Sequence, residues 1–115
     1  MENVHENWNE IFDQYDINLD DIYERDVIVY PAKKDVFRIF RMPVNDIKIV
    51  ILAQDPYHSV DTADGLAFSS RNSIPPSLRN IFKELKIEFP ERNYNFEHGD
   101  LSKWVENENI FLLHP

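Results

Sequence analysis

Residues 47–52, with the sequence IKIVIL, form a mostly apolar, β-branched run that stops abruptly at the polar and aromatic segment 54–58. A short run of this kind predicts a strand buried on both faces, as in a parallel sheet with helices on either side. In such sheets, ligands bind just beyond the carboxyl ends of the strands. Pro56 fixes its own φ and favours an extended conformation for Asp55, so the turn is stiff enough to aim a carboxylate.

A second apolar run, residues 110–113, predicts a second strand. The segment between the two runs is long enough for a crossover that makes neighbouring strands parallel. Asp55 and His114 would then leave the sheet at the same edge. We therefore expect an α/β fold with a parallel sheet flanked by helices, in three layers. It would form one domain over residues 1–115 and be apparently truncated after the second strand.

The spacing of apolar residues predicts helices around these strands. One is predicted after Ser77, which we expect to be its cap, and Pro90 would end it. Asp100 is expected to cap a short helix, and a further helix is predicted for residues 33–41. The helix predicted for residues 6–15 carries an apolar stripe that we expect to pack in the core, consisting of Trp8, Ile11, Phe12 and Tyr15.

Composition limits the classes of function. The chain has 115 residues, no cysteine and a net charge of −9. The lack of cysteine excludes disulfides and thiolate metal sites. The negative charge argues against a generic nucleic-acid-binding surface, although a local basic face remains compatible with DNA. No apolar run approaches the roughly 20 residues of a membrane span, and no basic and apolar leader opens the chain. We expect an intracellular protein, cytoplasmic or nuclear and possibly of viral origin, that does not bind a membrane.

The residues alone leave the chemistry at the end of the first strand open. A magnesium or manganese site is one alternative, but the spacing of the acids and the histidine matches no ligand motif, so we predict neither a metal nor a cofactor. An acid/base or electrostatic site is the other, in which Asp55 polarises a water molecule. Tyr57 and Phe68 would frame a flat ligand, if residues 65–69 form a short extended piece, and Gln54 would hydrogen-bond the ligand. The plainer alternative is that Asp55 is a turn residue and the aromatic residues are core.

Five ordered motifs carry a resemblance that covers nearly the whole chain. The segment V-I-L-A-Q-D-P-Y-H at residues 50–58 resembles the water-activating loop of family 1 uracil-DNA glycosylases, in which the pattern is V-I-L-G-Q-D-P-Y-H. The other four are similar to further motifs of this family: G-L-A-F-S at 65–69, P-P-S-L at 75–78, N-I-F-K-E-L at 80–85, and H-G-D-L with a tryptophan at 98–104.

The resemblance implies a function and a role for each matching residue. The function is hydrolysis of the N-glycosidic bond of deoxyuridine in DNA, with the nucleotide flipped out of the duplex. Asp55 would orient the attacking water, and Gln54 would offer a backbone amide to uracil. Tyr57 would exclude the methyl group of thymine, and Phe68 would stack on uracil. The residues implied to support the loop or contact DNA are His58, Pro75, Pro76 and Ser77.

The chain also departs from the pattern of the family. Ala53 replaces a glycine, and Asp64 stands where a histidine or a similar polar residue is usual. His114 stands where the family has the asparagine that reads uracil, and we keep it as a uracil-binding candidate. The later half of the pattern, with two more strands, a catalytic histidine and a leucine that plugs the duplex, has no counterpart here.

Two hypotheses follow. In the first, the chain is the amino-terminal half of a uracil-DNA glycosylase, which needs a second chain or a missing carboxyl-terminal half to complete its sheet. In the second, it is a degenerate, non-catalytic module that binds a protein or DNA. His114, the missing later half of the pattern and the charge of −9 favour the second hypothesis, whereas the intact segment 54–58 favours the first.

Overall fold

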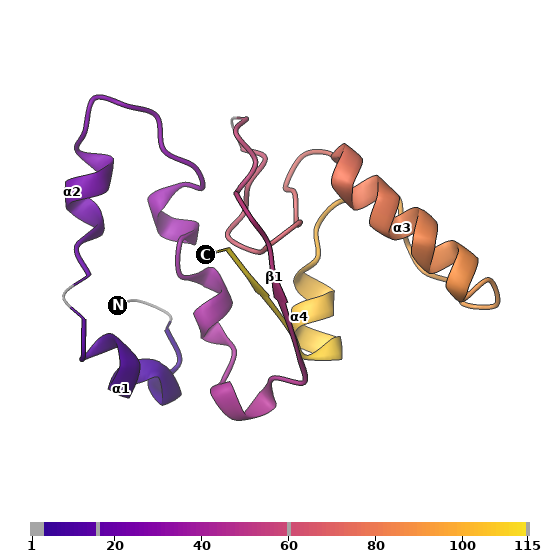
Figure 1. The fold of residues 1–115 in the computed structure, drawn as a ribbon, viewed down its shortest axis with the longest axis horizontal. Coiled ribbons are helices and arrows are strands. Elements are labelled where there is room, and N and C mark those ends of the chain that lie inside the picture. Colours follow the sequence, from indigo (N-terminus) through magenta and orange to yellow (C-terminus); the bar gives the residue numbers. More distant parts are fainter. Residues whose placement is uncertain (1–3, 16, 60, 115) are drawn as a thin grey trace.

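The computed structural model describes residues 4–15, 17–59 and 61–114. Strands β1 (Ile49–Leu52) and β2 (Ile110–Leu113) pair in parallel, and Leu52 lies opposite Leu113. Both predicted strands are confirmed, although β1 begins two residues after the start of the apolar run. The strands cross the middle of a flat molecule that measures 47 × 35 × 19 Å (Figure 1).

Two helices lie in the crossover between the strands, α3 (Pro76–Glu88) and α4 (Ser102–Glu108). Helix α3 begins before Ser77, with Pro76 in its first turn, where the missing N–H is not needed. The prediction that Ser77 caps this helix is therefore wrong. At the start of α4, a carboxylate oxygen of Asp100 accepts the Ser102 N–H at 2.9 Å, so this acid does satisfy an open backbone donor.

Short helical turns make up the chain before β1. The prediction of a continuous helix over residues 33–41 is wrong, because two separate 3₁₀ turns occupy this segment. Its β-branched and aromatic residues have low helix propensity, and the Asp35 carboxylate is tied to Arg71 at 3.0 Å. The elements are η1 (Glu6–Trp8), α1 (Asn9–Phe12), α2 (Leu19–Tyr23), η2 (Lys33–Asp35), η3 (Arg38–Arg41) and η4 (Val44–Asp46).

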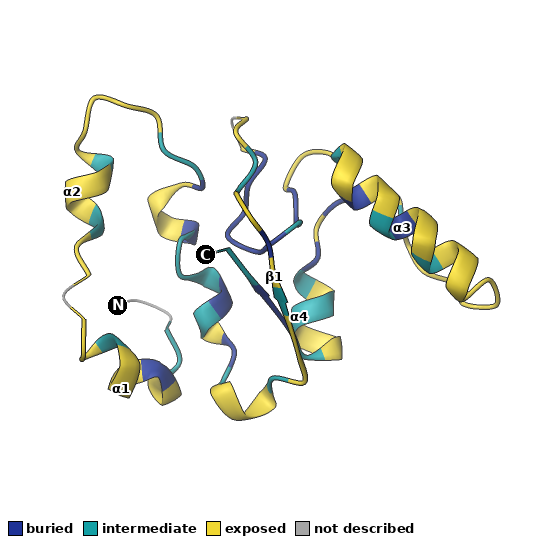
Figure 2. Cartoon of the chain, viewed as in Figure 1, coloured by how far each residue is buried: buried dark blue, intermediate teal, exposed yellow. Residues whose placement is uncertain are grey.

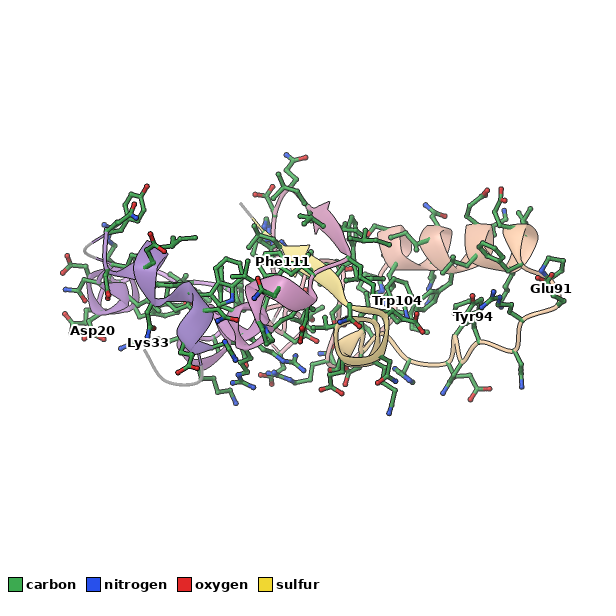
Figure 3. All side chains as sticks on the ribbon, turned by 90° about the horizontal axis from the view of Figure 1, so that it is seen from below. Asp20, Lys33, Glu91, Tyr94, Trp104 and Phe111 are labelled. Carbon is green, nitrogen blue, oxygen red and sulfur yellow. The ribbon has the colours of Figure 1, made fainter. Side chains whose placement is uncertain are left out.

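An aromatic cluster packs these turns against β2. The ring of Trp8 stacks on Phe111 with centroids 5.4 Å apart, and its indole N–H donates to the Met42 carbonyl at 2.7 Å. Figure 3 shows Phe111 near the middle of the molecule. The predicted core stripe of residues 6–15 is only half right, because Ile11 and Tyr15 are 48% and 63% exposed.

Strand β1 is exposed, which corrects the prediction of a strand buried on both faces. Ile49, Val50 and Leu52 are 53%, 59% and 63% exposed. Their side chains alternate between the two faces of the sheet, so neither face of β1 is fully covered. Figure 2 shows β1 mainly as exposed and β2 as largely buried, in line with the contacts that α4 and η3 make with β2. Along the described ranges, the helices are too short or too polar to cross a membrane.

Candidate functional site

The parallel register brings the predicted site residues to one edge of the sheet. The Ala53 N–H donates to the Leu113 carbonyl at 2.9 Å, which continues the pairing one residue beyond the end of β1. Segment 54–58 and His114 therefore leave the sheet at the same edge, as predicted. Gln54 and Asp55 are exposed there.

Tyr57 and Phe68 are held together. The Tyr57 hydroxyl donates to the Phe68 carbonyl at 2.7 Å. Burial raises the pKa of Tyr57, a hydrogen bond with Ser77 lowers it, and the negative charge of Asp64 raises it, with a net increase. The phenol thus stays a neutral donor, and it links the 54–58 turn to Phe68 and to the start of α3.

Residues 65–69 form a turn and not the predicted extended piece. Phe68 has a φ of +64°, a left-handed conformation that is unfavourable for an aromatic residue. The Ala67 N–H donates to the Leu112 carbonyl at 3.2 Å, which fixes the turn against the edge of β2 that faces away from β1. The hydrogen bond from Tyr57 holds the backbone of Phe68 beside the 54–58 turn.

A buried carboxylate, Asp64, holds this turn in place, and sequence reasoning gave it no role. Asp64 is 2% exposed and accepts the Leu66 N–H at 3.1 Å and the Ser69 hydroxyl at 2.5 Å. The Arg38 guanidinium lies 3.3 Å from the same carboxylate and also donates to Ser102 at 2.7 Å. Ser69 in turn accepts the Leu101 N–H at 2.9 Å. The one signal in the sequence was the departure of Asp64 from the family pattern.

The glycine that follows Asp64 is required by space and by conformation. Gly65 has a φ of +92°, and a Cβ atom built on it would lie 2.0 Å from the Asp35 carbonyl oxygen. Any larger residue would push the turn away from η2. Gly65 thus sets how closely the turn that carries Phe68 packs on the amino-terminal segment.

His114 is half-buried at the same edge. Burial lowers the pKa of its imidazole, the carboxylates of Asp64 and Asp55 raise it, and the net result is a lowered pKa. Its Nδ1 atom is fully covered and has no hydrogen-bond partner within the described part of the chain.

The remaining predicted residues surround this edge more loosely. His58 is exposed, Pro75 is half-buried and Pro76 is exposed at the start of α3. Ser77 is exposed next to Tyr57. The structure therefore links Tyr57 with Phe68 and Ser77 and places Asp55 and His114 at the same edge of the sheet. It leaves His58 outside the network of contacts described above.

Two open hollows of about 320 and 730 Å³ border η3, and none of the predicted site residues lines either of them. Within the described ranges, no group of three or more His, Cys, Asp or Glu residues is arranged to hold a metal ion. What the edge offers is an exposed carboxylate, two aromatic rings and an imidazole.

A parallel sheet with polar and aromatic side chains gathered beyond the ends of its strands defines an α/β protein, and that edge is where such sheets bind ligands. The similarity of the chain to known proteins identifies a family within this class. The chain is 49% identical over 89 residues to the uracil-DNA glycosylase of Buchnera aphidicola. The aligned residues cover 75% of this chain and 40% of that protein. The chain is 47% identical over 98 residues to the one of Mesomycoplasma hyopneumoniae, covering 84% of this chain and 43% of that protein.

Solved structures agree with these relatives. The chain superposes on mimivirus uracil-DNA glycosylase with a TM-score of 0.80 at 26% identity, over 97% of this chain and 46% of that one. A mimivirus variant in complex with UGI gives a TM-score of 0.79 at 27% identity, over 96% and 46% of the two chains. No family model matches the chain.

The chain belongs to the uracil-DNA glycosylase family. It spans about 40% of the length of the curated relatives it matches.

Proposed function

We propose that this chain supplies the water-orienting half of a uracil-DNA glycosylase site. The observation that supports this most is the parallel register, which gathers Asp55, the linked pair Tyr57 and Phe68, and His114 at one edge. The substrate would be deoxyuridine in DNA. We draw this role from the family to which the chain belongs and from the gathering of these side chains.

In the proposed reaction, Asp55 orients a water molecule and its negative charge stabilises the positive charge that develops on the sugar. The water oxygen bonds to C1′, the bond from C1′ to N1 of uracil breaks, and its electron pair leaves with the base. The attacking water passes a proton to the Asp55 carboxylate, which then releases it to the solvent. A carboxylate held on a stiff turn suits this task, because correct placement supplies much of the rate enhancement.

The other residues would bind the substrate. Gln54 would offer its backbone amide to uracil, Tyr57 would exclude a thymine methyl group, and Phe68 would stack on the base. His114 would contact the edge of the base. The residues proposed to support the loop or touch the DNA backbone are His58, Pro75, Pro76 and Ser77.

A partner segment is part of this proposal. A flipped base needs walls, and the described residues leave Gln54, Asp55 and His58 open to solvent. Within the described residues β1 pairs with β2 alone, so its other edge is free to pair with a further strand. We propose that a second polypeptide, or further sequence of the same protein, pairs with β1 and closes the site.

The test is a uracil-release assay on single-stranded DNA that contains deoxyuridine. It compares the chain alone with the chain co-expressed with the carboxyl-terminal segment of one of its relatives. We expect release from the assembled pair, and a loss of at least about a hundredfold for Asp55→Asn. The matched control is Asp61→Asn, since Asp61 is an exposed acid on the same loop with a φ of +58°, which asparagine tolerates.

Two outcomes would contradict the proposal. A folded pair that binds this DNA without releasing uracil would favour the non-catalytic module. Equal rates for the two variants would show that Asp55 does not take part.

A further inference from the structure

The larger of the two hollows that border η3 is lined by an excess of positive charge. Its volume is about 730 Å³, within the range of a few hundred to about 1,000 Å³ that is usual for small-molecule sites. One wall is segment 17–20 at the start of α2, and the other consists of residues from segment 33–41. Four basic residues and two acids line the hollow, in a chain with a net charge of −9. The basic residues are Lys33, Lys34, Arg38 and Arg41.

Both acids of this hollow already have a partner. Asp20 forms a salt bridge with Lys33, which links the two walls (Figure 3). Asp35 is buried and forms a salt bridge with Arg71 at 3.0 Å. Neither acid is therefore left to neutralise the other cations of the hollow.

Two of the four cations remain free. Lys34 and Arg41 are exposed, and neither takes part in a salt bridge within the described part of the chain. Arg38 is fixed by the Asp64 carboxylate at 3.3 Å and by the Ser102 hydroxyl at 2.7 Å. The hollow thus presents two positive charges that lack a partner among the described residues.

The smaller hollow does not share this excess. Arg38 and Arg41 also border it, but Asp46 and Glu106 line it as well, so its formal charges balance. An anionic ligand is therefore expected in the larger hollow.

Apolar side chains lie beside the free cations. Ile17 is 40% exposed, and Leu19 and Phe37 are half-buried in the walls of the larger hollow. The ring of Phe37 packs edge-on against Phe12 with centroids 5.3 Å apart, which holds it in place. Free cations next to a fixed apolar wall suit a ligand that has an anionic end and a flat body.

We propose that the larger hollow binds a nucleoside monophosphate. A phosphate monoester carries a charge of about −1.5 to −2 near pH 7, which matches two free cations, whereas a carboxylate would leave one of them unpaired. The planar guanidinium of Arg41 can hold two phosphate oxygens at once, and Lys34 adds a point charge. The base lies against Leu19 and Phe37. This site shares no residue with the sheet edge described above, so the inference does not depend on the proposed function.

The experiment is an NMR titration of the complete chain, labelled with ¹⁵N, with thymidine 5′-monophosphate, thymidine or inorganic phosphate. Thymine is chosen because the role proposed for Tyr57 keeps it away from the sheet edge. Amide shifts in segments 17–20 and 33–41 report binding in the hollow, and shifts in segment 54–58 report binding at the edge.

Two pairs of variants separate specific contacts from general effects. Arg41→Gln is matched by Lys103→Gln, which removes the same charge from an exposed position outside both hollows. Ile17→Ser is matched by Ile28→Ser, since Ile28 is 80% exposed and also lies outside both hollows. All four positions are exposed, so we expect the variants to fold.

We expect thymidine 5′-monophosphate to shift the amides of the hollow and to bind more tightly than either thymidine or inorganic phosphate. Arg41→Gln should weaken its binding about tenfold, as expected for one hydrogen bond between charged groups. Ile17→Ser should weaken it by a smaller factor, and the two matched variants should bind it like the unchanged chain.

Three results would overturn the inference. The first is the absence of shifts in the hollow. The second is equal affinity for the nucleotide and for inorganic phosphate, which would indicate an adventitious ion only. The third is an equal loss in Arg41→Gln and Lys103→Gln, which would show that net charge alone is responsible. Shifts confined to segment 54–58 would contradict both this inference and the exclusion of thymine by Tyr57, whereas the uracil-release assay tests the proposed function alone.

Discussion

At the scale of single residues, charge and burial oppose each other around His114. Burial disfavours its imidazolium form, whereas the carboxylates of Asp64 and Asp55 favour it. Asp64 has two tasks here, since it also holds the turn that carries Phe68. A single substitution at Asp64 therefore tests electrostatics and positioning together.

We predict that Asp64→Asn lowers the pKa of His114 further below its ordinary value. The asparagine keeps an oxygen for the Leu66 N–H but removes the negative charge that stabilises the imidazolium. NMR titration of His114 measures the shift. Glu91→Gln is the control, because Glu91 lies on the exposed turn after α3, at the far end of the molecule (Figure 3). A rise in the pKa of His114 in Asp64→Asn would contradict the stated electrostatics.

Gly65 gives the second prediction at this scale. Gly65→Ala should destabilise the chain by about 1–3 kcal/mol, because the residue has a positive φ and its Cβ would strike the Asp35 carbonyl. Urea unfolding followed by tryptophan fluorescence measures the loss. Ala63→Gly, in the same buried segment, is a comparison that removes a methyl group without adding a clash. An unchanged midpoint for Gly65→Ala would show that the turn moves away without cost.

At the scale of elements, the periodicity of the sequence correctly predicted the strands and the helix whose formation depends on local residues. The runs at 47–52 and 110–113 became parallel strands, and the spacing from Leu78 to Leu85 became α3. It failed where distant contacts decide. The 33–41 segment has helical spacing, but Asp35 is held by Arg71 and abuts Gly65, and the backbone breaks into two turns.

The candidate site divides in the same way. Its position beyond the strand ends, with Asp55 and His114 at the same edge of the sheet, followed from the parallel topology alone. The role of Asp64 did not, because Arg38, Ser69 and Leu101 come from three separate parts of the chain. The exposure of β1 was also missed. An apolar run indicates that a strand can be buried, but it does not indicate which other element covers the strand.

At the scale of the whole molecule, the chain has a net charge of −9 and one uncovered apolar strand. Charge keeps copies apart, while the open edge of β1 draws strands together. The balance between the two sets how the chain behaves in solution.

We predict that Val50→Lys weakens both self-association and the docking of a completing segment. Val50 is 59% exposed, so the substitution leaves the fold intact, and a lysine on an edge strand blocks pairing. Sedimentation velocity should show that Val50→Lys stays monomeric up to a several-fold higher protein concentration than the unchanged chain. Ile87→Lys is the matched control, as Ile87 is 63% exposed on α3, away from the sheet. The same effect from both variants would mean that charge alone is responsible.

The turn that carries Phe68 also determines which edge of the sheet can pair with a further strand. Since Ala67 bonds to the Leu112 carbonyl, the outer edge of β2 is already occupied, and the edge of β1 is the one left open. A building block with a single free edge is monovalent. Two such blocks can close into a pair, whereas the loop that bonds to Leu112 hinders a third from pairing along β2. The loop that carries Phe68 thus also limits assembly at that edge of the sheet.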